Sequence, residues 1–184
     1  MCIRDRLETV RGFRFADSDT KLEQVVSQTF PQLLQTTRAL LDSPQADLPA
    51  VGEIVYYALK VYKTSMVITL TQHQQSQESI VSWGTLMLRV VQKQVDDSAL
   101  ASDPEGRAKM PWWKAKKWAF FSLNKLFSRY GIPSQLAPGM RSYKPFAETF
   151  LTNFAPEILK AYLHTVETSV TQHQWLSPPV TRSL

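Results

Sequence analysis

The chain has 184 residues, of which 43% are hydrophobic and 20% charged, so it holds enough apolar material for a core and is not disordered as a whole. With only 6 glycines, the composition favours long helices over sheet folds that need many tight turns. The single cysteine excludes an intramolecular disulfide, and three dispersed histidines beside it argue against structural zinc.

The formal net charge of +5 and the pI near 9.4 are compatible with two interpretations. The charge either solubilises the surface or attracts an acidic partner such as nucleic acid, anionic lipid or an acidic protein. Membrane insertion is not expected, because no apolar run approaches the roughly 20 residues of a membrane helix. The charged start lacks the apolar region of a signal peptide, and the lone cysteine suits the reducing cytosol or nucleus.

Residues 1–18 have little periodicity and are interpreted as a preceding element or a non-native start. From residue 19, apolar side chains at three- and four-residue spacing predict a long helix that ends near Asp42. Pro31 lies inside this helix and is expected to kink it. A second helix is expected from near Asp47, with Pro49 in its first turn, towards Leu70.

The polar residues 71–76 are expected to form a loop, followed by a third helix with Trp83 in the core. Residues 96–109 break the pattern and are expected to form an exposed loop. The fourth helix should begin at Pro111, which suits a first helical position, and end at Tyr130 before Gly131.

Residues 132–142 are expected to form another loop, and a fifth helix should follow Tyr143 with Pro156 in its middle. Trp175 and Leu176 then mark the entry to a sixth helix.

The segments 30–34 and 154–159 each place a proline inside a predicted helix, after an aromatic residue and before apolar ones. This similarity predicts repeated helix–turn–helix units, although two unrelated prolines would look the same. The predicted fold is all-α, a HEAT/armadillo-like helical-repeat solenoid of about three helix pairs. The expected repeats are 19–70 and 76–131, with partial repeats in 143–184. Both ends stop within the pattern, so we expect an excerpt of a longer array.

No motif of an enzyme is present: the sequence lacks a nucleophile motif, a phosphate-binding loop and metal-ligand spacing. His73, His164 and His173 are far apart and are interpreted as solvated side chains. We therefore expect no catalytic residue, no cofactor and no metal.

The most distinctive segment is 111–120, in which three tryptophans and three lysines fall within seven residues. At 100° per residue, Lys114, Lys117 and Lys125 lie on one side of the helix, whereas Trp118 lies on the opposite side and is expected to be buried. Simple amphipathic packing, with solvated lysines, accounts for this pattern. The alternative is a surface for an acidic or nucleic-acid partner. The candidate partner-binding residues are Lys114, Lys117, Lys125 and Arg129, joined by Lys116 if the ligand is nucleic acid.

The segments 111–119 and 126–131 closely resemble a stretch of the importin-beta superfamily, the karyopherins. The likeness is best to the branch of importins seven and eight and their fungal relatives. It continues downstream through 143–147 and covers most of the chain between about residues 20 and 180.

The resemblance implies a nuclear transport receptor, which carries protein cargo through the nuclear pore under control of the GTPase Ran. Its implied partners are Ran, cargo and nucleoporins, with no direct nucleic acid and no membrane insertion. Its implied location is the nucleus and cytoplasm, including the nuclear envelope and pore. An exportin, a HEAT-repeat scaffold without shuttling activity and a nucleic-acid-binding helical domain are the alternatives. No residue of this chain acquires a Ran, cargo or nucleoporin contact from the resemblance.

Overall fold

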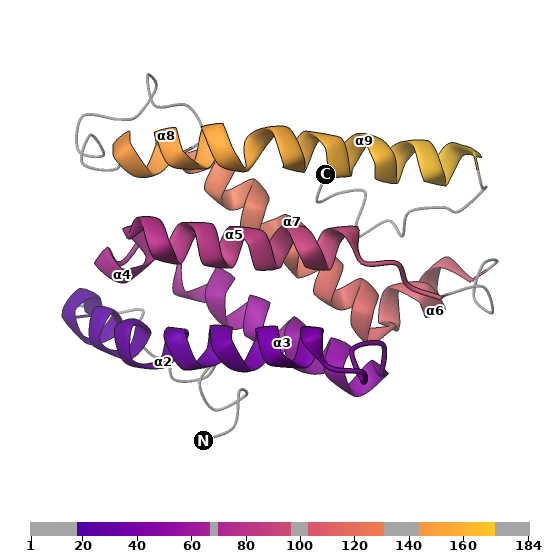
Figure 1. Ribbon diagram of the computed structural model, residues 1–184, viewed down its shortest axis with the longest axis horizontal. Helices are drawn as coiled ribbons and strands as arrows, with labels where there is room; N and C mark the ends of the chain where they lie inside the picture. Colours follow the sequence, from indigo (N-terminus) through magenta and orange to yellow (C-terminus); the bar gives the residue numbers. More distant parts are fainter. Residues whose placement is uncertain (1–17, 67–69, 97–102, 131–143, 172–184) are drawn as a thin grey trace.

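The computed structural model describes residues 18–66, 70–96, 103–130 and 144–171, and every regular element within these ranges is a helix (Figure 1). The all-α prediction is confirmed, and no described helix is long and apolar enough to cross a membrane. The elements are α2 (Ser18–Asp42), α3 (Pro49–Ser65), α4 (Gln72–Gln75), α5 (Gln77–Gln92), α6 (Pro104–Lys109), α7 (Pro111–Tyr130), α8 (Lys144–Asn153) and α9 (Ala155–Thr171).

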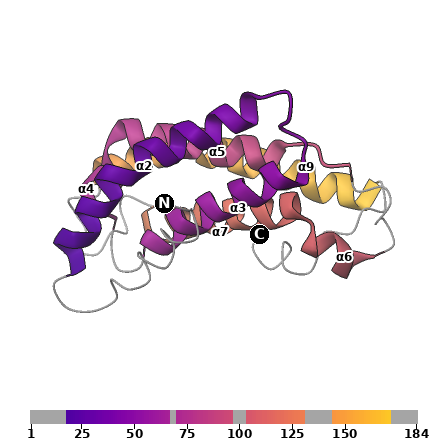
Figure 2. The same ribbon diagram turned by 90° about the horizontal axis from the view of Figure 1, so that it is seen from below.

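The long helices lie in two layers. One layer holds α2, α5 and the consecutive helices α8 and α9, and the other holds α3 and α7 (Figure 1). Figure 2 shows α3 and α7 beneath α2 and α5. The chain therefore alternates between the layers from α2 to α3, α5, α7 and the α8–α9 pair, and each long helix packs on its neighbours in its own layer. This is the architecture of a HEAT-type solenoid, so the predicted fold class is confirmed.

Arginines link α2 and α5, the first two helices of the layer that also holds α8 and α9. Arg38 Nη2 of α2 donates to the carbonyl of Ser82 at 3.1 Å, and Arg89 Nη2 of α5 donates to the carbonyl of Leu41 at 2.8 Å. Arg89 also pairs with Asp42 at 2.5 Å. Because the residue numbers on both helices rise together along these contacts, α2 and α5 run in the same direction, as equivalent helices of stacked repeats do.

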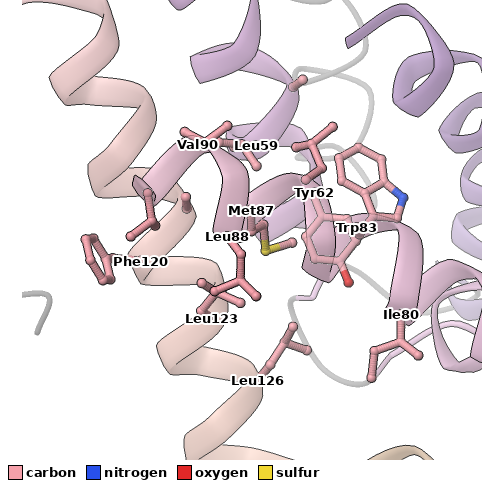
Figure 3. Packing of buried hydrophobic residues seen from close by; sticks show 14 of the residues in the cluster. Leu59, Tyr62, Ile80, Trp83, Met87, Leu88, Val90, Phe120, Leu123 and Leu126 are labelled. Carbon is pink, nitrogen blue, oxygen red and sulfur yellow. The ribbon is translucent and has the colours of Figure 1, made fainter. Parts of the chain in front are cut away.

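Three aromatic rings join the first three long helices in the core. Phe30 of α2, Tyr62 of α3 and Trp83 of α5 are all buried. The rings of Tyr62 and Trp83 lie 4.7 Å apart, and Phe30 lies 5.6 Å from Trp83. Figure 3 shows Tyr62 and Trp83 on one side of Met87 and Leu123. The prediction of a buried Trp83 is therefore confirmed.

The predicted fifth helix is wrong, because it is two helices that meet at Phe154. Pro156 is the second residue of α9, where its missing donor costs no hydrogen bond within the helix. Pro31, in contrast, lies inside α2 as predicted. The proposed likeness between the two prolines therefore does not hold.

Two predicted loops contain short helices. Within 71–76, Thr71 and Gln74 form a capping box around α4, and Glu23 of α2 accepts the backbone N–H groups of Gln72 and His73 at 2.5 and 3.0 Å.

Within 96–109, Asp103 accepts the N–H of Gly106 at 2.8 Å and starts α6. Arg107 of this supposedly exposed segment is only 1% exposed. The helices α4 and α6 are too short to show the apolar periodicity from which helices were predicted in the sequence.

The second helix, α3, stops at Ser65 and does not reach Leu70. The Ser65 hydroxyl donates to the carbonyl of Tyr62 at 2.6 Å and accepts the Gln74 side chain at 2.7 Å. The helices over 77–92 and 111–130 agree with the predictions, and Ser76 caps α5. The predictions for residues 1–17, Gly131, 132–142, His173, Trp175 and Leu176 fall outside the described residues.

A methyl group at Gly84 should disturb the contact between α5 and the α8–α9 junction. A Cβ atom at this position would lie 2.5 Å from the ring of Phe154, which real Cβ atoms do not tolerate. We expect Gly84→Ala to lower the free energy of unfolding by about 1–3 kcal/mol, despite the higher helix propensity of alanine. Urea unfolding followed by circular dichroism measures the change.

Thr85→Ala is the matched control, because Thr85 is the next residue of α5 and is exposed. It should leave stability within about 0.5 kcal/mol of the parent chain. Adding Phe154→Leu to Gly84→Ala should cost less than the two single changes together. A Gly84→Ala chain as stable as its parent would contradict the close packing of α5 on Phe154.

Candidate protein-binding surface

Aromatic and lysine side chains gather where α3 and α7 lie side by side. On α3 they follow the three- and four-residue spacing of one helix face, and on α7 they do the same. All of them are partly exposed. We call this surface the aromatic–lysine face; it consists of Tyr56, Tyr57, Lys60 and Lys63 of α3 and Lys114, Lys117, Trp118 and Phe121 of α7.

Small residues let α3 and α7 approach closely. A Cβ atom on Gly52 would lie 3.0 Å from the Trp112 ring, so the glycine makes room for the indole. Trp112 is 4% exposed, and its indole N–H donates to the carbonyl of Asp47 at 3.3 Å. Ala115 and Ala119 of α7 are fully buried. The contact between α3 and α7 is the most extensive between any two described helices.

The two helices run in the same direction. Gly52 meets Trp112 near their starts, and Lys125 donates to the carbonyl of Met66, the C-cap of α3, near their ends. Between these contacts, the rings of Tyr56 and Trp118 lie 6.2 Å apart. The two stripes therefore adjoin along the length of α3.

Lysine ammonium groups lie over the aromatic rings of this face. Lys60 Nζ lies 5.3 Å from the ring centre of Tyr56 and 5.6 Å from that of Trp118. Lys63 Nζ lies 5.2 Å from Trp118, and Lys117 Nζ lies 5.4 Å from Phe121. Each is within the range at which a cation is attracted to a ring. These contacts hold the charges in place without neutralising them.

The face carries an excess of positive charge. Glu53 of α3 approaches Lys114 at 3.7 Å, and both side chains are about one-third exposed, at 36% and 37%. Among the described residues, no carboxylate lies within ion-pair distance of Lys60, Lys63 or Lys117. Four lysines and one glutamate leave a formal charge of +3 on this surface.

Of the four predicted binding residues, two lie together on this surface. Lys114 and Lys117 belong to the aromatic–lysine face. Lys125 is partly buried and caps the end of α3, which is a structural role for a lysine at a helix C-terminus. Arg129 lies in α7, but its side chain is outside the described residues. Lys116 lies over Trp113, at 5.2 Å.

The prediction that Trp118 is buried is wrong. Trp118 is only partly buried and packs at the edge of the core, whereas Trp112 is the buried tryptophan of α7. The sequence analysis also missed the residues that α3 contributes. The spacing of Tyr56, Lys60 and Lys63 was a signal for one face of α3, but it did not indicate that α7 lies beside it.

No group of three or more histidine, cysteine, aspartate or glutamate side chains within the described ranges could hold a metal ion. His73 lies in α4 and is partly buried, while His164 lies on α9 and is exposed.

Comparisons with known proteins indicate which family this chain belongs to. No family model and no solved structure match the chain. Over 92% of the chain it is 30% identical to the Nonsense-mediated mRNA decay protein 5 of Saccharomyces cerevisiae. Over 82% it is 28% identical to the Importin beta-like SAD2 homolog of Arabidopsis thaliana, and over 68% it is 29% identical to Importin-8 of Mus musculus.

The chain belongs to the importin-beta superfamily. The resemblance noted in the sequence is thus confirmed, including its likeness to importin eight. The chain spans 16%, 14% and 12% of the lengths of these three relatives.

Replacing Trp112 and Trp118 with alanine, one at a time, should distinguish the buried tryptophan from the partly exposed one. Trp112→Ala should lower the free energy of unfolding by about 3–5 kcal/mol, because it leaves a large cavity against Gly52. Trp118→Ala should cost about 1–2 kcal/mol, since it removes a partly exposed ring and its lysine contacts. Chemical unfolding of both variants tests this order, with Lys117→Ala as a control that should change little. The reverse order would contradict the assignment of the two side chains.

Proposed function

We propose that this chain is a segment of a nuclear transport receptor that carries protein cargo through the nuclear pore under control of the GTPase Ran. The observation that carries the proposal is the match of most of the chain to proteins named as importins, together with the two-layer helical array. Each relative is much longer than this chain, so the activity proposed is that of a complete receptor of which this segment forms part.

The architecture suits such a receptor physically. In a stacked array each repeat contacts only its neighbours, so small rotations between repeats add up to a large change of curvature. Cargo and Ran would each favour one curvature, and the difference in affinity would couple their binding. The long contact between α3 and α7, with its small side chains, is the joint at which such a rotation would occur in this segment.

We further propose how the helices group into repeats. The range 19–70 contains α3 and all of α2 except Ser18, and 76–131 contains α5 and α7 with α6 between them. Helices α8 and α9 would form the first part of the next repeat, within 143–184. An apolar groove of about 240 Å³ lies between α7 and α9, lined by Phe120, Leu123 and Ile158 among others.

Leu159 and Leu163 of α9 are 59% and 63% exposed. The second helix of that next repeat would extend the row of α3 and α7 and pack over this apolar surface.

The direction of transport and the partners follow from the same proposal. We propose import, with Ran, protein cargo and nucleoporins as partners and residence in the nucleus and cytoplasm, including the nuclear pore. An exportin would use the same array with the opposite response to Ran. A HEAT-repeat scaffold without shuttling activity would use it without any response to Ran.

A binding assay with the complete open reading frame tests the proposal. The full-length protein, immobilised with cell extract as the source of cargo, should retain Ran locked in its GTP form and should release bound cargo when Ran is added. Ran locked in its GDP form is the control and should bind at least tenfold more weakly, a difference of about 1.4 kcal/mol or more. Cargo that joins on addition of Ran would make the protein an exporter. Indifference to Ran would contradict the receptor proposal.

A further inference from the structure

We propose that the aromatic–lysine face binds an acidic protein segment, in which aspartate or glutamate side chains alternate with apolar ones. The proposal comes from the chemistry of the face itself and does not depend on Ran or on cargo transport. It differs from the residues proposed from the sequence, because it takes Lys60 and Lys63 from α3 and leaves out Lys125 and Arg129.

Charge complementarity is the first argument. Lys60, Lys63 and Lys117 have no ion-pair partner among the described carboxylates. Lys63 lies between the other two along the face: it shares the Trp118 ring with Lys60 and the Phe121 ring with Lys117. Three ammonium groups held this close repel one another, and an approaching carboxylate relieves that repulsion. Charge-assisted hydrogen bonds to carboxylate oxygens would then be the main gain on binding.

The rings supply the second part of the site. Trp118 and Phe121 meet edge to face, with centroids 5.8 Å apart and an interplanar angle of 89°. Both remain partly exposed, so apolar side chains between the acidic ones would contact the parts of the rings that the lysines leave open. Tyr56 accepts a hydrogen bond from Lys60 at 3.0 Å and keeps its own hydroxyl hydrogen to donate to a carboxylate.

An acidic peptide fits this face better than nucleic acid does. Binding of single strands relies on open ring faces on which bases stack. Here lysine ammonium groups already lie over the rings: Lys60 and Lys63 lie over Trp118, and Lys63 and Lys117 lie over Phe121. Carboxylates can reach the lysines without displacing them, whereas a stacked base could not.

Glu53 allows a second test of the proposal, in which the expected change in binding has the opposite sign. Its carboxylate lies 3.7 Å from Lys114 and is the one acidic group of the described residues at this face. A bound acidic segment would meet repulsion from Glu53 and would compete with it for Lys114. Removing the charge should therefore strengthen binding, while removing lysine charges should weaken it.

The experiment measures binding of a fluorescein-labelled peptide that alternates glutamate with serine and carries a central phenylalanine, by fluorescence anisotropy with the 184-residue chain. The Lys63→Gln, Lys117→Gln double variant should bind about tenfold more weakly, and Glu53→Gln should bind about threefold more tightly. Binding should weaken as salt is added. Melting curves check that each variant folds.

The matched control is the Lys144→Gln, Lys160→Gln double variant, which removes the same charge from exposed lysines of α8 and α9. It should bind the peptide as the parent chain does. An equal loss in this control, or no binding by the parent chain, would overturn the proposal.

Two further binding measurements decide between an acidic peptide and nucleic acid as the ligand. The same peptide with glutamine in place of glutamate should not bind. Tighter binding of a single-stranded oligonucleotide of equal charge, lost in the Lys63→Gln, Lys117→Gln variant, would also overturn the proposal, in favour of nucleic acid. If the lysine variant does not fold, the direction of the Glu53→Gln effect decides: tighter binding supports the proposal and weaker binding contradicts it.

Discussion

The close, parallel packing of α3 on α7 is the contact on which the rest of this structure depends. It requires small side chains at the interface, with Gly52 making room for the Trp112 ring and with Ala115 and Ala119 fully buried on α7. A larger side chain at any of these positions would force the helices apart. The same contact brings the two stripes of the aromatic–lysine face together.

This packing also explains how a solenoid can hold a binding surface without a closed pocket. Each of the two helices contributes half of the aromatic–lysine face, with two aromatic rings and two lysines. In the other layer, α2 and α5 are joined differently: Arg38 and Arg89 each donate to a backbone carbonyl of the neighbouring helix. A rotation between repeats would change the spacing of lysines on α3 and α7. In the proposed receptor, curvature and the chemistry of the face would therefore be coupled.

Much of the fold could be predicted from the sequence, because long helices have strong apolar periodicity and clear ends. The start of α7 at Pro111 and the start of α5 after Ser76 are examples. The short helices α4 and α6 were missed, since a few capped residues have no period to detect. The break at Phe154 was missed because the apolar pattern continues through it, and only the position of Pro156 marks it.

The candidate site could be predicted only in part. A helical wheel identified Lys114 and Lys117 as surface lysines, but it cannot tell which helix lies next to them, so Lys60 and Lys63 were not included. It also placed Lys125 with the surface lysines, although a carbonyl at the end of α3 holds that side chain. Trp118 lies at the border of the apolar stripe, where a large ring extends past the narrow interface towards solvent.

Nuclear magnetic resonance of the Gly52 backbone would test the central contact most directly. The chain has only 6 glycines, so the Gly52 α-protons can be assigned with isotope labelling. Because they lie against the face of the Trp112 indole, their resonances should shift well upfield and show nuclear Overhauser effects to the indole protons. Shifts near those of an unstructured glycine, without such effects, would contradict the parallel packing of α3 on α7.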